Sequence, residues 1–131
     1  MRDQIRFKIG KEEKNIQEKW IEIPEGTEHI QMMIEMPEEF RYMAFLFLED
    51  PKKEIRFQKL LGYGQQNPGI GKSTKDTTIG GVPGEIYPGT WKIGIGIFTE
   101  YVAQKLGEQT GEIVLTVSDR KDVVSDPIGG E

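Results

Sequence analysis

Short runs in which apolar and polar residues alternate are the feature that most restricts the fold of this 131-residue chain. In the segment Gln4–Ile9, the side chains of Ile5, Phe7 and Ile9 fall on one side and the polar side chains on the other. Successive side chains of a β-strand point to opposite faces, so a period of two predicts a strand with one buried face. The same alternation appears in Glu18–Ile23, His29–Met36, Trp91–Phe98 and Glu112–Val117.

Other segments complete the set of expected strands. Tyr42–Leu48 is apolar on both faces, which predicts a central strand that is covered on both sides. Ile55–Leu60 is a weaker strand, and Asp76–Ile79 is expected to be a short strand at a sheet edge. The turn Pro24–Thr27 predicts that the two strands flanking it pair as an antiparallel hairpin.

The 16 glycines and 7 prolines lie mostly between these runs, as expected where turns separate strands. We therefore predict an all-β fold, an antiparallel two-sheet β-sandwich or jelly roll of about 7–8 strands. The connection Thr99–Gly111 has room for one helical turn. Residues 1–118 are expected to form this single domain, and residues 119–131 a polar C-terminal tail.

The composition excludes several classes of protein. There is no cysteine, so disulfides and thiolate chemistry are excluded. The 17 basic and 22 acidic residues give a net charge of −5 and are interspersed, unlike the basic face of a nucleic-acid binder. The longest apolar run, Met43–Leu48, is too short to span a membrane, and the first residues lack the apolar region of a signal peptide. We expect a cytoplasmic protein with no nucleic-acid or membrane partner.

The stretch Gly71-Lys72-Ser73 is similar to the end of a phosphate-binding loop. Such a loop needs a glycine five positions before Gly71, where this chain has Gln66. It also needs a buried parallel strand before it and a helix after it, whose N-terminus holds the phosphates. The residues after Ser73 are rich in threonine and glycine, so no helix is expected there and we predict no nucleotide binding.

The residues of catalytic and metal-binding sites are sparse. His29 is the only histidine, and the alternation places it on an exposed polar face. One histidine and no cysteine cannot supply a typical zinc site. Asp119, Asp122 and Asp126 lie close together, but their spacing is not that of a calcium-binding EF-hand loop. We predict no catalytic residue, no metal and no cofactor, and therefore not an enzyme.

The segment Gly62–Lys75 is the candidate recognition site. It has no strand alternation, and long loops in compact domains are usually functional or disordered. Its side chains offer stacking, hydrogen bonds and a positive charge, but no activated nucleophile or base. The candidate ligand- or partner-binding residues are Tyr63, Gln65, Gln66, Asn67, Lys72 and Tyr87. A surface loop without function is the alternative.

Two glycines in one expected strand, Gly94 and Gly96, indicate close approach by something bulky. Either an aromatic ring from the neighbouring strand lies across them, or they form the floor of a shallow groove that admits a ligand. Exposed aromatic residues such as Tyr63, Tyr87 and Trp20 are candidates for the rim of such a groove. Trp91 is expected in the core, because it begins the apolar face of its strand.

Three motifs follow one another along the chain: Asp50-Pro51 after an expected strand, then Gly62-Tyr63-Gly64, then Pro88-Gly89-Thr90-Trp91. This order resembles the N-terminal β-sandwich of CehA-type metal-dependent hydrolases in the PHP (polymerase and histidinol phosphatase) phosphoesterase superfamily. The resemblance covers roughly residues 15–118. The chemistry of that family lies in a downstream domain with His-x-His metal motifs, which this sequence lacks. The resemblance therefore implies a β-sandwich with an accessory role.

The expected function is that of a non-catalytic accessory or interaction module. The alternative is a domain that binds a carbohydrate or another small polar ligand, and a hydrolase with an unrecognised site is less favoured. The expected partner is a protein or a second copy of the chain, with a glycan as the alternative. The weakly charged edge Thr77–Ile79 is expected to pair in a homodimer.

Overall fold

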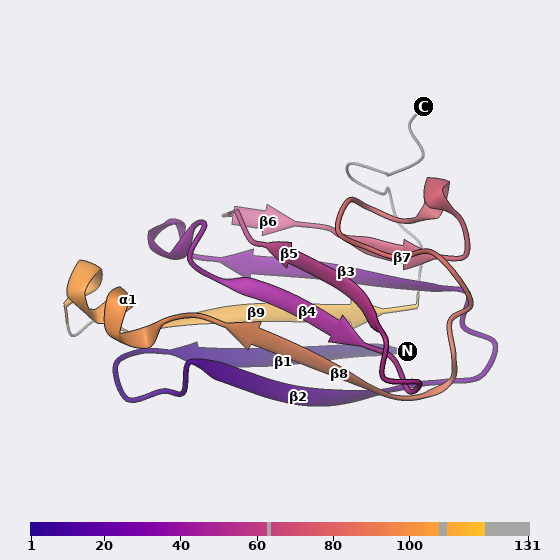
Figure 1. Ribbon diagram of the computed structural model, residues 1–131, viewed down its shortest axis with the longest axis horizontal. Coiled ribbons are helices and arrows are strands. Elements are labelled where there is room, and N and C mark those ends of the chain that lie inside the picture. Colours follow the sequence, from indigo (N-terminus) through magenta and orange to yellow (C-terminus); the bar gives the residue numbers. More distant parts are fainter. Residues whose placement is uncertain (63, 108–109, 120–131) are drawn as a thin grey trace.

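The computed structural model describes residues 1–62, 64–107 and 110–119 (Figure 1). The described strands are β1 (Arg2–Ile9), β2 (Ile16–Ile23), β3 (His29–Met36), β4 (Phe45–Glu49), β5 (Ile55–Leu60), β6 (Gly64–Gln66), β7 (Gly69–Gly71), β8 (Gly89–Gly96) and β9 (Gly111–Ser118). The described helical elements are α1 (Thr99–Leu106) and the 3₁₀ turns η1 (Glu38–Phe40) and η2 (Thr74–Asp76). In this part of the chain, none of the helices has the length and apolar character of a membrane span.

The strands form two antiparallel sheets, stacked as a β-sandwich (Figure 1). One sheet has the order β1-β9-β3, and β6 and β7 pair with successive parts of β3, so that together they fill a fourth position. The other sheet has the order β2-β8-β4-β5. The described strands thus occupy eight positions, which confirms the predicted all-β two-sheet sandwich. The central strands of the second sheet are β8 and β4, and β4 overlaps the segment that was predicted to be central.

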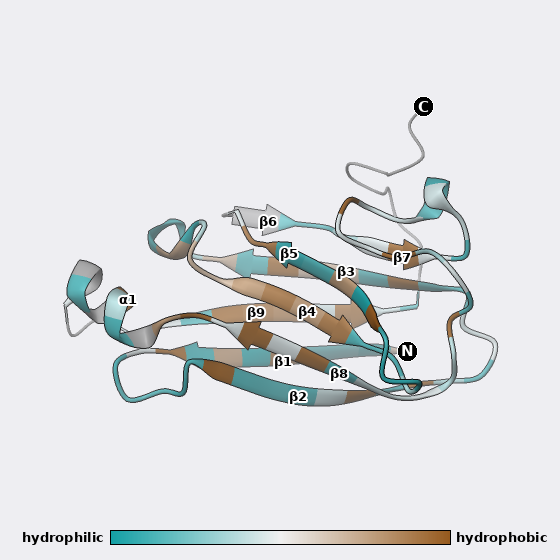
Figure 2. Cartoon of the chain, viewed as in Figure 1, coloured by the Kyte–Doolittle hydropathy of each residue, from teal (hydrophilic) through white to brown (hydrophobic). Residues whose placement is uncertain are grey.

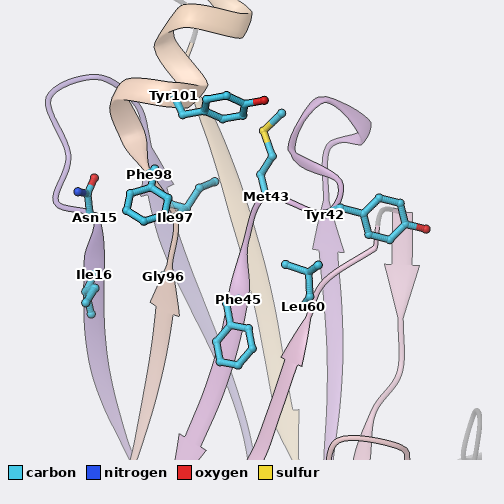
Figure 3. Close-up of a pocket in the computed structure, with 10 residues that line it drawn as sticks. All are labelled: Asn15, Ile16, Tyr42, Met43, Phe45, Leu60, Gly96, Ile97, Phe98 and Tyr101. Carbon is cyan, nitrogen blue, oxygen red and sulfur yellow. The ribbon is translucent and has the colours of Figure 1, made fainter.

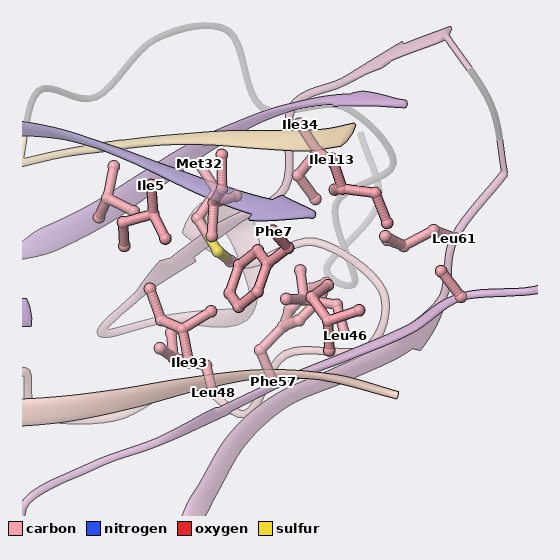
Figure 4. Close-up of a cluster of buried hydrophobic side chains, with 14 of the residues drawn as sticks. Ile5, Phe7, Met32, Ile34, Leu46, Leu48, Phe57, Leu61, Ile93 and Ile113 are labelled. Carbon is pink, nitrogen blue, oxygen red and sulfur yellow. The ribbon is translucent and has the colours of Figure 1, made fainter. Parts of the chain in front are cut away.

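The core lies between the sheets and is built from the alternating apolar positions, which appear as bands along the strands in Figure 2. Phe7 is fully buried. In Figure 4 its ring lies between Met32 and Ile34 of one sheet and Leu46 and Leu48 of the other. Each fully buried side chain of this kind contributes about 1.5–3 kcal/mol to folding, so the period of two in the sequence accounts for the stacking of the sheets.

The prediction that β2 and β3 form a hairpin is wrong. β2 pairs with β8, whereas β3 pairs with β9, β6 and β7, so residues 24–28 cross from one sheet to the other. An apolar face on each strand predicts burial in the core but does not identify the strand that pairs with it. Stacked sheets lie about 10 Å apart, a distance that a connection of a few residues spans easily.

The segment Gly62–Lys75 is not the structureless loop that was predicted, because β6 and β7 pair with β3. The predicted edge strand Asp76–Ile79 does not form either. Asp76 belongs to η2, and the buried Thr77 and Thr78 accept hydrogen bonds from the backbone N–H groups of Gly71 (3.0 Å) and Gly69 (3.2 Å). These threonines hold β7 in place, so the predicted dimer edge at Thr77–Ile79 is not a free strand.

Candidate functional site

A row of apolar side chains crosses the outer face of the second sheet. Ile16 of β2 is paired with Gly96 of β8, Gly96 with Phe45 of β4, and Phe45 with Leu60 of β5. Directly paired residues of neighbouring strands point to the same face. Ile16, Phe45 and Leu60 are all exposed, so β4 is buried on its inner face only, and the prediction that both of its faces are covered is wrong.

This row is the floor of an apolar groove of about 580 Å³. Its walls come from the segments next to the floor: Asn15 precedes β2, Tyr42 and Met43 precede β4, Ile97 and Phe98 follow β8, and Tyr101 lies on α1. Figure 3 shows these side chains around the end of the sheet, with Tyr101 and Phe98 on one side and Tyr42 on the other. The polar groups of the lining side chains are one amide and two tyrosine hydroxyls.

The groove wall formed by Tyr42 has an uncommon backbone conformation. Tyr42 has a φ of 59°, in the left-handed region that bulky residues rarely adopt. Its N–H donates a hydrogen bond to the carbonyl of Leu61 (2.8 Å), and the N–H of Met43 donates to the carbonyl of Phe40 (2.9 Å). Conformations of this kind often occur at binding sites, where surrounding contacts hold them. Here they hold Tyr42 at the mouth of the groove, with 64% of the residue exposed.

The two glycines of β8, Gly94 and Gly96, have different roles. The sequence predicted either a covering aromatic ring or a shallow groove, and each of these applies to one of the two glycines. A Cβ atom at Gly94 would overlap the ring of Phe47, which is paired with Gly94 from β4. At Gly96 a Cβ atom would meet nothing within 4 Å. Gly94 therefore accommodates an aromatic ring, whereas Gly96 opens the floor of the groove.

Beyond Phe47, the outer face becomes polar. The Lys92 ammonium lies 3.0 Å from a Glu18 carboxylate oxygen and 3.7 Å from one of Glu49. The hydrogen bond with Glu18 raises the pKa of Lys92 above its ordinary value. This network leaves one net negative charge beside the groove. It separates the groove from Trp20 of the edge strand β2, which is paired with Lys92 of β8.

The structure does not bring together those predicted recognition residues that it describes. Lys72 lies 3.7 Å from Glu28 and 3.9 Å from Glu85. The side-chain oxygen of Gln66 accepts a hydrogen bond from the N–H of Gly62 (3.1 Å). Gln65 lies in β6, where its backbone pairs with Glu35 of β3. Tyr63 lies outside the described residues.

Asn67 and Tyr87 also have separate surroundings. The Asn67 carbonyl accepts a hydrogen bond from the side chain of Gln31 (3.2 Å). The Lys52 ammonium lies over the ring of Tyr87, 4.2 Å from the ring centroid. The backbone carbonyl of Tyr87 accepts a hydrogen bond from the indole N–H of Trp91 (2.7 Å). Neither residue lines the groove, so Tyr87 is not part of its rim, and the aromatic residues of the walls are Tyr42, Phe98 and Tyr101.

The surroundings of Lys72 differ from those of a phosphate loop. The strand before it, β7, has three residues and is antiparallel to β3, and the element after it is the 3₁₀ turn η2. A phosphate loop joins a parallel strand to an α-helix. The absence of nucleotide binding stays a prediction, now with a local structural reason.

His29 is not the exposed residue that was predicted. It is buried against β7, and its Nε2 lies 2.9 Å from the amide oxygen of Gln31. An amide oxygen only accepts hydrogen bonds, so Nε2 carries the proton. A Cβ atom at Gly69 would lie 2.9 Å from this nitrogen, which explains a glycine at that position. His29 is thus held by a neighbour on its own strand, and the side-chain N–H of Gln31 also donates to the carbonyl of Pro68 (3.2 Å), just before β7.

A second hollow, of about 440 Å³ and more polar, lies beside His29. Its lining includes Lys72, Asp76 and Asp119, and Asp119 accepts a hydrogen bond from the N-terminal amine (3.0 Å). Among the described residues, no group of three or more histidine and carboxylate side chains is arranged to hold a metal ion. Asp122 and Asp126, the other two acidic residues considered for calcium, lie outside those residues.

Comparison with known proteins adds no relative: neither a family model nor a curated protein matches this chain. The assignment of the apolar groove as a candidate site is therefore supported by its geometry alone. Two signals in the sequence pointed toward it, the run Tyr42–Leu48 with two apolar faces and the glycine pair Gly94 and Gly96. Neither identified the side chains of the walls.

The two glycines provide a matched pair of substitutions. Gly94→Ala is expected to displace the Phe47 ring and to lower the free energy of unfolding by about 1–3 kcal/mol, as overpacking does. Gly96→Ala is expected to change it by less than about 0.5 kcal/mol, because the new methyl group enters open space. Urea denaturation of both variants measures the difference, and equal losses of stability would contradict the assignment.

Proposed function

We propose that this chain is a non-catalytic interaction module that binds an apolar surface of a protein through the groove. The observation that carries the proposal is the cluster of exposed apolar residues around a concave floor, with Tyr42, Phe98 and Tyr101 in its walls. Exposed apolar patches rimmed by polar residues are typical of protein interaction sites. Aromatic side chains provide most of the binding energy at such sites.

The alternative, a site for a carbohydrate or another small polar ligand, has less support. A sugar has many hydroxyl groups, and each one that leaves water needs a hydrogen-bond partner. The groove offers the amide of Asn15 and the hydroxyls of Tyr42 and Tyr101, spread around an apolar floor. The amide-bearing residues that motivated a sugar site, Gln66 and Asn67, do not line the groove.

The accessory role fits the resemblance to the N-terminal sandwich of CehA-type PHP phosphoesterases. That resemblance rests on the motifs at Asp50-Pro51, Gly62-Tyr63-Gly64 and Pro88-Gly89-Thr90-Trp91, which stay similarities of sequence. In the fold, Asp50 closes the turn between β4 and β5, and Trp91 is a core residue. An accessory domain needs a docking face and no catalytic group, and the groove is such a face.

The test is selection of displayed peptides on the immobilised full chain at low surface density, followed by affinity measurement in solution. We expect selected peptides to carry an aromatic or aliphatic anchor and to bind the Leu60→Glu variant at least tenfold more weakly. Ile79→Glu is the matched control, because Ile79 is exposed to a similar degree (57% against 48% for Leu60) and lies outside the groove. Selected peptides that bind Leu60→Glu as tightly as the wild type, or no selected peptide at all from a chain that is monomeric under these conditions, would refute the proposal.

A further inference from the structure

We propose that the partner of the groove is a second copy of this chain, in a dimer with two-fold symmetry whose interface is the outer face of the β2-β8-β4-β5 sheet. In this dimer Trp20 of each copy lies in the groove of the other. The inference rests on the proposed function, since it identifies the apolar protein surface that the groove binds. It replaces the edge-to-edge dimer through Thr77–Ile79, because those residues do not form a free strand.

A two-fold interface uses the same patch on both copies, so that patch must be complementary to itself. The outer face meets this requirement, because it carries both a hollow and a projecting side chain. Trp20 and Ile16 lie four residues apart on β2 and therefore point to the same face, about 13 Å apart along the strand. A two-fold axis that lies in the plane of the interface, midway between Trp20 and the centre of the groove, places the indole of each copy over the groove of the other.

The apolar area of this face, with Trp20 included, lies at the upper end of the range for a single copy. The exposed fractions are 64% for Tyr42, 39% for Phe45, 75% for Phe98, 48% for Tyr101 and 60% for Trp20. With roughly 200 Å² for one fully exposed aromatic side chain, these residues present on the order of 600 Å². The largest patch on a typical monomer is about 300–600 Å², and each partner in a standard interface buries about 800 Å².

The aliphatic residues Ile16 and Leu60 enlarge the patch further, with 62% and 48% of their surface exposed. Between Trp20 and the groove, Lys92 pairs with Glu18 and Glu49, which leaves one net negative charge, so this strip is expected to stay hydrated at the interface. The edge strand β1 is less suited to association, since it exposes Arg6 and Lys8 and charged residues protect a sheet edge from pairing.

The test is analytical ultracentrifugation of the full chain over a range from about 1 µM to several hundred µM. We expect the wild type to pass from the monomer mass of 14.9 kDa to twice that mass. Trp20→Ala and Leu60→Glu are each expected to weaken dimerisation at least tenfold, and Ile79→Glu to leave it unchanged. Far-UV circular dichroism checks that each variant is folded.

A mixture of the two weakened variants tests the geometry itself. The Trp20→Ala copy keeps its groove and the Leu60→Glu copy keeps its indole, so a mixed dimer has one intact contact. We expect the mixture to dimerise more tightly than either variant alone. A wild type that stays monomeric, a dimer that both substitutions leave unchanged, or a mixture no better than its components would overturn the inference.

The two proposals can fail separately. If the wild type is monomeric but selected peptides still bind through Leu60, the second copy is not the partner and the interaction module stands. If the wild type is monomeric and no peptide depends on Leu60, both proposals fail. A dimer that is lost in both Trp20→Ala and Leu60→Glu and recovered in their mixture supports both.

Discussion

Asp50→Ala is expected to lower the free energy of unfolding by about 3–5 kcal/mol, the range for breaking a buried ion pair by removal of one partner. Asp50 is buried, and its carboxylate lies 3.5 Å from the guanidinium of the equally buried Arg56. Domains of this kind are stable by only about 5–15 kcal/mol. The substitution therefore removes a large fraction of the stability and lowers the melting temperature by on the order of 10–20 °C.

The carboxylate of Asp50 has two tasks, which explains the expected size of the effect. One oxygen accepts hydrogen bonds from the backbone N–H groups of Lys52 (2.8 Å) and Glu54 (3.0 Å), in the turn between β4 and β5. The other faces Arg56, whose guanidinium also donates to the carbonyls of Val82 (3.1 Å) and Glu85 (2.6 Å). In the alanine variant, Arg56 keeps its charge in the interior with no counter-charge among these partners.

Two further variants separate these tasks. Asp50→Asn keeps an oxygen for the turn but removes the charge, so we expect a smaller loss of stability than for Asp50→Ala. The double variant Asp50→Ala/Arg56→Met removes both charges and is expected to recover part of the loss. Urea denaturation of all three variants provides the free energies. A loss below about 1 kcal/mol for Asp50→Ala would show that the ion pair is not buried as described.

The strands could be predicted from the sequence because their signal is local. Alternation predicts a strand at His29–Met36, the bounds of β3, and the weaker strand predicted at Ile55–Leu60 has the bounds of β5. The pairing of β2 and β3 could not be predicted, since an apolar face does not identify a partner. β6 and β7 were missed because their pairing uses backbone groups of glycine-rich segments and the hydroxyls of Thr77 and Thr78. The sequence pattern of those segments has no alternation.

The candidate site was predictable only in part. Glycine at two positions of β8 indicates close approach, but the paired position of Phe47 decides that Gly94 is covered and Gly96 open. The run Tyr42–Leu48 predicts a strand with two apolar faces, and whether anything covers the outer face depends on the whole chain. The polar residues Gln66 and Asn67 suggested recognition by their chemistry, but their side chain and carbonyl hold the fold together locally.

Trp91→Ala is the second substitution with a large expected effect, a loss of about 3–5 kcal/mol in the free energy of unfolding. Trp91 is fully buried, and its indole N–H donates a hydrogen bond to the carbonyl of Tyr87 (2.7 Å). The alanine variant loses the packing of the largest core side chain and leaves a cavity. Trp91→Phe keeps an aromatic ring but no donor, so it should cost less and isolate the penalty of the unpaired carbonyl.

Trp91 and Asp50 are expected to act on stability together, because both contact Arg56. The guanidinium carbon of Arg56 lies 5.5 Å from the centroid of the Trp91 ring, within the range of a cation–π interaction. The loss of the ring should therefore remove support from the same arginine that the loss of Asp50 leaves unpaired. In a double-mutant cycle of Asp50→Asn, which removes the charge, and Trp91→Ala, which removes the ring, we expect a coupling energy of about 0.5–3 kcal/mol, the range for residues that share a contact. Strictly additive losses would mean that Arg56 does not link the two residues, and that the turn after β4 and the start of β8 are stabilised independently.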